Sequence, residues 1–172
     1  MSDAKPFDRP RFFAGRLLTT GDFALEQNYF RGKLKRHNRT LHGFGIVSGL
    51  SVTVVSGRVA VTAGLALDCE GNELVVGTNE ILPAPPASWQ TAYVNVHFVE
   101  QELNEDATTN EATIIRETAA VDFAAKNFNS NHRHLRGRWL ACGKCHPLTI
   151  ARLRHGAGGW RVDRRYRPPA VK

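Results

Sequence analysis

The chain has 172 residues, of which 42% are hydrophobic and 23% are charged, and its formal net charge is +7. This is the composition of a globular domain and excludes a disordered chain, and no run of about 18 apolar residues is present to cross a membrane. Residues 1–13 lack an apolar secretory signal and three cysteines do not make a disulfide framework, so we expect a cytoplasmic protein. We expect one domain over residues 1–172, with flexible ends at residues 1–10 and 167–172.

The charge is distributed unevenly along the chain. Its balance is +5 over residues 1–45, −8 over residues 46–130 and +10 over residues 131–172. A strongly basic protein is compatible with nucleic-acid binding. An acidic middle between basic ends also favours contacts between copies or with other proteins, where opposite patches orient the association. Charge alone does not choose between these partners.

The first predicted element is an α-helix over residues 21–38. Thr19 and Asp22 have the spacing of a capping box, and basic residues crowd the end of the segment, as the helix dipole favours. Gly43 and Gly45 end the helix. Apolar residues recur at helical spacing and predict a face packed on a core, which consists of Phe23, Phe30, Leu34 and either His37 or Leu41.

After the helix the hydrophobic period changes to two, which predicts β-strands. The expected strands lie at residues 46–55, 58–62, 65–68, 73–76, 93–100, 113–123, 148–153 and 160–164. Many short strands separated by turns, together with one helix, favour a mainly β fold. We therefore predict an antiparallel barrel or sandwich of short strands with one N-terminal α-helix.

The pair Cys142 and Cys145 has the C-x-x-C spacing with which two thiolates hold one Zn²⁺ ion. His132 and His134 lie close enough in sequence to complete a tetrahedron. The alternative, which the residues alone favour, is two half-buried cysteines in a turn. No local nucleophile motif or catalytic constellation occurs, so we expect no catalytic residues, no cofactor other than zinc, and no enzymatic activity.

The basic C-terminal third carries interleaved aromatic residues. Trp160, Arg164 and Tyr166 fit a protein interface, in which aromatic residues and arginine are enriched. A strand with one solvated face is the second interpretation. Binding of a nucleic-acid backbone with base stacking is the third.

Four segments resemble an uncharacterised family associated with gene clusters of phage tails and extracellular contractile injection systems. They are residues 11–23 (RFFAGRLLTTGDF), 26–30 (EQNYF), 37–50 (HNRTLHGFGIVSGL) and 63–76 (AGLALDCEGNELVV). Looser matches at residues 93–100, 113–118 and 142–153 extend the resemblance over most of the chain. The order of these features is also similar to the N-terminal shoulder of type VI secretion baseplate adaptors and of some siphophage receptor-binding proteins. Such shoulders are β-rich and dock onto a baseplate.

The resemblance implies that residues 11–30 dock on a partner or anchor the core. We expect most of Phe12, Phe13, Leu17, Leu18 and Phe23 to be core, with Arg11, Arg16 and one aromatic residue reaching the partner. The protein would then be a structural or adaptor component of a phage-tail-like contractile particle, near the baseplate. Its partners would be other baseplate or tail proteins, or further copies of itself. The alternative is a small zinc-stabilised β module that binds nucleic acid through residues 131–172.

Overall fold

The computed structural model describes residues 5–109, 111–132, 134, 135, 138, 139, 142 and 144–171. Helix α1 (Thr20–His37) continues into a single π-helical turn, η1 (Asn38–His42). The strands are β1 (Gly45–Gly49), β2 (Val52–Val55), β3 (Arg58–Val61), β4 (Gly64–Leu67), β5 (Glu73–Val76), β6 (Glu80–Leu82), β7 (Thr91–Glu105), β8 (Ala112–Ala124), β9 (His134–Leu135), β10 (Arg138–Trp139), β11 (Leu148–Gly156) and β12 (Gly159–Val162), with a 3-10 turn, η2 (Phe128–Asn131).

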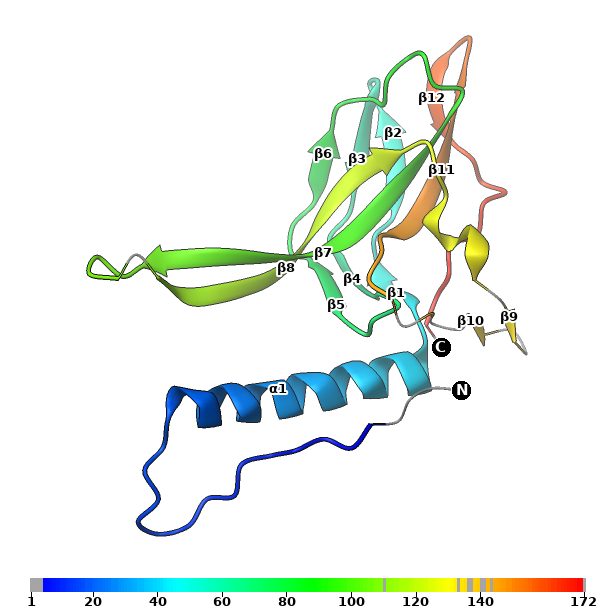
Figure 1. Cartoon of the computed structure of the whole chain (residues 1–172). Coiled ribbons are helices and arrows are strands. Elements are labelled where there is room, and N and C mark those ends of the chain that lie inside the picture. The colour runs from blue at the N-terminus through cyan, green and yellow to red at the C-terminus, as the bar shows by residue number, and fades with distance from the viewer. Residues whose placement is uncertain are drawn as a thin grey trace.

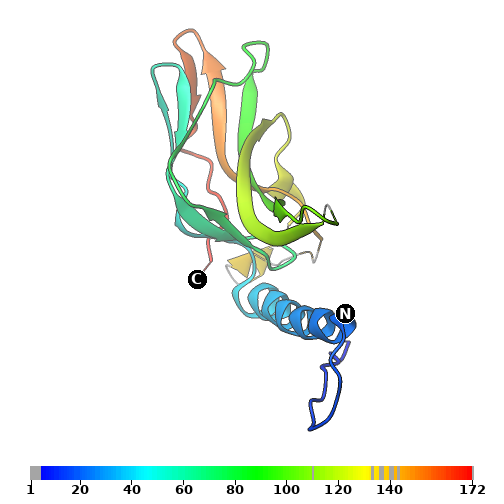
Figure 2. The ribbon, with the colours of Figure 1, turned by 90° about the vertical axis from the view of Figure 1, so that its left-hand side faces the viewer.

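The strands form antiparallel sheets, which confirms the predicted mainly β fold. Their orders are β1-β4-β5, β2-β3-β6 and β12-β11-β7-β8, with a separate β10-β9 pair. Figures 1 and 2 show the three larger sheets curling around a common interior. We call this part the β body.

The core of the β body follows from alternation along its strands. On β3, Val59 and Val61 are fully buried, and on β7 Val94 and Val96 are fully buried beside them. Leu74 of β5 is also completely buried and joins the same cluster. Because successive side chains of a strand point to opposite faces, β3, β5 and β7 each supply alternate residues to this interior.

The β7–β8 hairpin is longer than the sequence analysis predicts. Twelve residue pairs join the two strands, from Tyr93 with Ala124 to Glu105 with Ala112. The part beyond Phe98 is mostly exposed and projects from the β body (Figure 1). This extension has no core beneath it, so cross-strand pairing, rather than burial, supports it.

Helix α1 lies outside the β body (Figure 1), and none of its residues is buried. The predicted boundaries are correct within one residue, but the predicted core-facing role is wrong. Phe23, Phe30 and Leu34 are each more than half exposed, and so is Leu41 of η1. Their helical spacing is real, but the face that they form is turned to solvent.

The C-terminal residues pack on strand β1. The Ile46 amide donates a hydrogen bond to the Pro169 carbonyl, and the Val171 amide donates to the Ile46 carbonyl, both at 2.9 Å. Gly45 has a φ of +138°, and a Cβ there would lie 2.6 Å from the Pro169 carbonyl carbon. Glycine at this position therefore allows the close approach of residues 169–171.

Candidate docking surface and metal-ligand cluster

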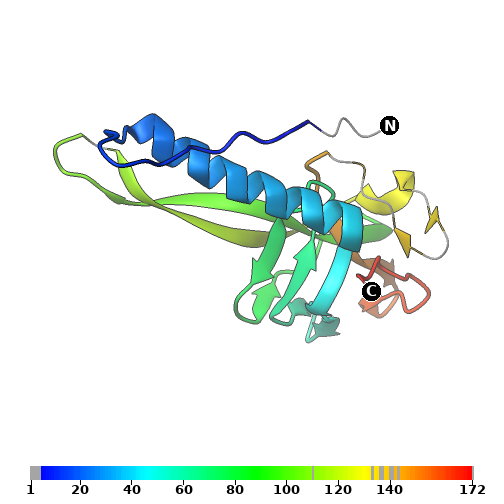
Figure 3. The same cartoon turned by 90° about the horizontal axis from the view of Figure 1, so that it is seen from below.

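The N-terminal segment folds back along α1, and we call residues 5–42 the N-terminal arm (Figure 3). The Arg36 guanidinium lies 4.1 Å from the centre of the Phe7 ring and donates a 3.0 Å hydrogen bond to the Lys5 carbonyl. A Cβ on Gly32 would lie 2.7 Å from the Phe7 ring. Gly32 therefore weakens the helix but makes room for Phe7.

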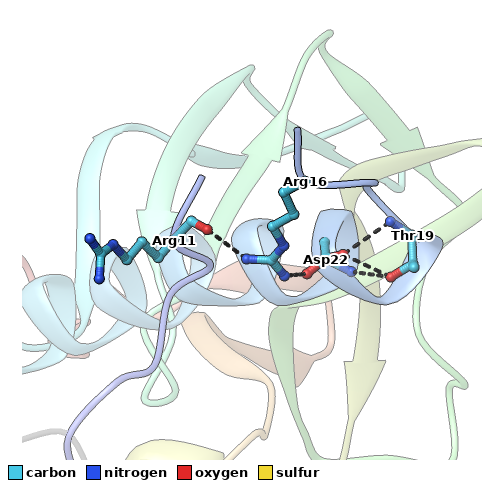
Figure 4. Close-up of polar contacts among 4 residues, drawn as sticks. All are labelled: Arg11, Arg16, Thr19 and Asp22. Carbon is cyan, nitrogen blue, oxygen red and sulfur yellow. Dashed lines mark hydrogen bonds and ion pairs between the residues drawn. The ribbon is translucent and has the colours of Figure 1, made fainter. Parts of the chain in front are cut away.

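Polar contacts fix the bend that enters α1 (Figure 4). Arg16 forms an ion pair with Asp22 and donates a 2.6 Å hydrogen bond to the Arg11 carbonyl. Asp22 also accepts the Thr19 amide at 3.0 Å, while the Thr19 hydroxyl accepts the Asp22 amide, which completes the predicted capping box. The Thr19 amide is the main cause of the lowered pKa of Asp22, with Arg16 contributing. Arg16 is therefore committed to this bend, whereas the Arg11 side chain remains exposed.

Large hydrophobic side chains are exposed along the arm. Leu17 is 86% exposed and Phe13 is 63% exposed. The helix adds Phe23, Phe30 and Leu34, whose spacings of seven and four residues set them in one stripe. We call the following set the arm surface: Phe12, Phe13, Leu17, Leu18, Phe23, Leu25, Phe30 and Leu34. The expectation that most of its N-terminal members are core is therefore wrong.

Only a few contacts attach α1 to the β body. Near its C-terminal end, the buried Asn38 amide donates a 3.0 Å hydrogen bond to the Gly71 carbonyl. Gly71 has a φ of +95°, and a Cβ there would overlap the Lys35 carbonyl. Farther along the helix, the Arg31 guanidinium reaches Glu100 at 2.7 Å and Glu117 at 3.5 Å on the hairpin. Figure 3 shows α1 lying alongside this hairpin.

The turn between β4 and β5 is built to receive the helix end. One carboxylate oxygen of Asp68 accepts the amides of Glu70, Gly71 and Asn72 at 2.8–2.9 Å. The other carboxylate oxygen accepts the Asn72 side-chain amide at 2.7 Å. This turn, residues 68–72, holds the Gly71 carbonyl where Asn38 reaches it.

The C-terminal residues named as interface candidates are not all at the surface. Trp160 is only 9% exposed, belongs to the core and donates its indole N–H to the Pro85 carbonyl at 3.0 Å. Tyr166 is half-buried, and its hydroxyl accepts the Asn129 side-chain amide at 3.1 Å. Arg164 is exposed and lines an open groove of about 900 Å³. The structure therefore places most of Trp160 in the core, and its small exposed part lines the same groove as Arg164.

Four metal-ligating side chains converge at one place: Cys69, His132, Cys142 and His146. Their ligand atoms all lie within 4.8 Å of one another. The His132 Nε2 atom lies 2.9 Å from the Cys69 sulfur and 3.0 Å from the His146 Nε2 atom. Two of the four, Cys142 and His132, belong to the predicted zinc set, whereas Cys69 and His146 do not. The side chain of His134 lies outside the described residues.

Cys145 belongs to a different group, with Asp68 and Glu70. Both oxygens of the Asp68 carboxylate already accept hydrogen bonds from amide groups of the turn. Burial raises the pKa of the Cys145 thiol, with the charges of Asp68 and Glu70 acting in the same direction. Sequence reasoning missed Cys69 and His146, although Cys69 lies in a compact turn and His146 directly follows Cys145.

Burial shifts the pKa of Cys69 and of His132 in opposite directions. It raises the pKa of the Cys69 thiol. A hydrogen bond with the Cys142 backbone lowers this pKa, whereas the Cys142 side chain raises it. Burial and the adjacent His146 lower the pKa of His132, which favours the neutral imidazole that binds metals. A cation placed among these atoms would favour the thiolates instead.

Comparison with solved structures shows a likeness of fold to TssK. A chain of the type VI secretion system TssK-TssF-TssG baseplate subcomplex has a TM-score of 0.57 and 14% identity, over 96% of this chain and 62% of that one. A chain of the type VI secretion baseplate complex gives 0.57 and 13%, over 96% and 42%. The crystal structure of TssK gives 0.54 and 12%, over 96% and 44%.

This likeness confirms the expected resemblance to a type VI baseplate adaptor at the level of the fold. The chain spans less than two thirds of each of those chains. The sequence matches no protein-family profile and no curated protein. Among the described residues, no helix has the length and apolar character needed to span a membrane.

Proposed function

We propose that the protein is a structural adaptor of a phage-tail-like contractile particle, located at or near its baseplate. It acts through protein–protein contacts, and the proposal assigns no catalytic step to it. The main support is the fold likeness to chains from type VI baseplate structures, which extends over 96% of this chain. The contractile-system pattern in the sequence, including the arginine and phenylalanines at positions 11–13, supports the same role.

The arm surface is the proposed docking site, and its occupant is another baseplate protein. Phe13 and Phe30 are each more than 60% exposed, and aromatic side chains dominate the binding energy of many interfaces. Phe23, Phe30 and Leu34 lie along one helix face, and the bend before the helix adds Phe12, Phe13, Leu17 and Leu18. Such grouping marks interaction sites on soluble proteins.

Charge defines the partner further. Residues 1–45 carry a balance of +5, and Arg11 is exposed beside the phenylalanines. The partner that fits is a protein with an apolar groove and an acidic rim, because complementary charges orient the encounter while apolar burial supplies affinity. The acidic β7–β8 hairpin of a second copy also has this charge and exposes Ile114 and Ile115, so self-association is the alternative outcome of the test.

The first prediction concerns docking by this surface. The genes beside this one are expected to encode sheath, tube and spike proteins, and their purified baseplate products are the partners to test. Phe30→Ser should weaken binding to the cognate baseplate protein by about 30-fold or more, as loss of a buried aromatic contact does. Titration calorimetry with the full chain measures this change.

Ile81→Ser provides the matched control. Ile81 on β6 is 61% exposed, as is Phe30, but it lies on the β body. We expect this variant to bind like the unchanged protein. Equal loss in both variants, or no baseplate protein that binds, would contradict the proposal. Concentration-dependent dimerisation that Phe30→Ser abolishes would assign the arm surface to a second copy.

A further inference from the structure

We propose that Cys69, His132, Cys142 and His146 bind one Zn²⁺ ion in a structural site. A tetrahedral ion bound by two thiolates and two imidazoles sets its ligand atoms about 3.4–3.8 Å apart, from bond lengths of about 2.1–2.3 Å. The four ligand atoms here lie within 4.8 Å of one another, and two of their separations are 2.9 and 3.0 Å. Small side-chain rotations therefore reach the coordination geometry.

The surroundings of the cluster suit a closed metal site. Cys69 is fully buried, and the ring of Phe44 lies 4.3 Å from that of His132, measured between centres. The His146 Nδ1 atom lies 2.8 Å from the Pro147 carbonyl oxygen, so it is Nδ1 that carries the proton and donates. The His146 Nε2 atom, 3.0 Å from the His132 Nε2 atom, is then the ring nitrogen that would bind a metal. Zinc-bound histidines are oriented by this kind of second contact.

The donor set favours zinc over harder cations. Two sulfurs and two imidazole nitrogens are typical of structural Zn²⁺ sites, whereas Mg²⁺ and Ca²⁺ prefer oxygen ligands. The nearby carboxylate of Asp68 is engaged with amide hydrogens on both of its oxygens. Cys145 groups with Asp68 and Glu70 instead of with the four ligands. The site is thus distinct from the C-x-x-C pair that the sequence suggests.

The ligands come from parts of the chain that are far apart in sequence. Cys69 lies in the turn of residues 68–72, which holds the end of α1 through Gly71 and Asn38. The other three lie between η2 and β11. A bound ion would join this segment to the base of the arm. Zinc binding is therefore expected to stabilise both regions together.

The test uses the full chain, purified with reductant, stripped of metal and titrated with Zn²⁺. We expect about one zinc per chain, together with a rise in melting temperature. Co²⁺ in place of zinc should give the visible absorption of a tetrahedral thiolate complex. Cys142→Ser and His146→Gln should each lower zinc affinity by more than the roughly 10–100-fold that loss of an outer contact costs.

Cys145→Ser is the matched control and should keep full zinc binding. Loss of zinc in Cys145→Ser with retention in His146→Gln would overturn this ligand set. Absence of zinc binding by the reduced, unchanged chain would overturn the site itself. A Cys69–Cys142 disulfide in the purified protein, with no zinc taken up after its reduction, would also overturn it. Because Cys142 is exposed, its variant is expected to fold and remain interpretable.

Discussion

In the β body, alternate residues of β3, β5 and β7 are fully buried, whereas in the N-terminal arm no residue of α1 is buried. The strands of the body pair in sheets and share one core. The arm has regular structure and a full capping box, but Phe23, Phe30 and Leu34 of its apolar stripe stay more than half exposed within the part of the chain that the structure describes. In proteins, most of the stability of a helix comes from the packing of its apolar face rather than from intrinsic propensity. This difference motivates the proposal that the arm packs on another molecule.

The largest expected effect is on the free energy of unfolding, and the same leucine-to-alanine substitution tests it in both regions. Leu74→Ala empties a fully buried position on β5 and should lower the free energy of unfolding by about 2–5 kcal/mol. Leu34→Ala on α1 removes the same atoms from a side chain that is 52% exposed. It should change stability by less than about 0.5 kcal/mol.

Urea unfolding of both variants, followed by far-UV circular dichroism, measures this contrast. The two leucines serve as controls for each other, since the chemical change is identical. If Leu34→Ala destabilises the protein by more than about 1 kcal/mol, then α1 packs on the β body in solution and the contrast fails.

The same contrast explains what the sequence predicts well. The helix boundaries follow from Thr19, Asp22 and Gly43, all of which act locally. The strands follow from a period of two, and their burial follows from the core that they share. The exposure of Phe23 and Phe30 does not follow, because helical spacing is the same whether the stripe packs on its own core or on a partner.

The remaining differences between prediction and structure come from residues that are distant in sequence but close in the fold. Gly32 has a low helix propensity, so local sequence rules do not explain it. The position of the Phe7 ring, which leaves no room for a Cβ, does explain it. Cys69 is far from Cys142 in sequence, so no spacing rule joins them, and the C-x-x-C pattern directs attention to Cys145 instead. Trp160 is of a residue type that is enriched at interfaces, but the fold places it in the core. The sequence pattern therefore predicts the helices and strands, whereas the candidate sites depend on contacts between residues that are far apart in sequence.

The joint between the two regions gives an intermediate effect. Asn38→Ala removes the hydrogen bond to the Gly71 carbonyl and leaves a buried acceptor unpaired, at a cost of about 1–3 kcal/mol. Alanine is the better helix former, so any loss reports the contact and not helix propensity. Hydrogen exchange should become faster throughout α1 but remain slow in β3 and β7.

Arg39→Ala is the control for the joint, since Arg39 neighbours Asn38 in η1 and lies away from the core cluster. We expect it to leave exchange in α1 unchanged. Equal acceleration in α1 and in the strands after Asn38→Ala would show that arm and body unfold as one unit, and the proposed division would be lost.

The smallest effect appears only in acid and compares one carboxylate from each region. Asp163 in the β body accepts the Arg165 amide at 3.0 Å, Arg154 at 2.6 Å and Arg152 at 2.8 Å. The Arg165 amide is the main cause of its pKa of about 2, with the two guanidinium groups contributing. Asp22 in the arm has a pKa that is also lowered, mainly by the Thr19 amide.

Because the folded pKa of Asp163 lies below the ordinary value of 3.8, its stabilisation is complete above that pH and is lost as the pH falls toward about 2. Asp163→Asn should therefore flatten the decline of global stability between about pH 4 and pH 2. Asp22→Asn should leave that decline unchanged, because the arm frays without unfolding the core, and should alter only exchange in the first turn of α1. Urea unfolding at several pH values distinguishes the two variants. A global acid effect from Asp22→Asn as large as that from Asp163→Asn would mean that the helix start contributes to the same cooperative unit as the strands.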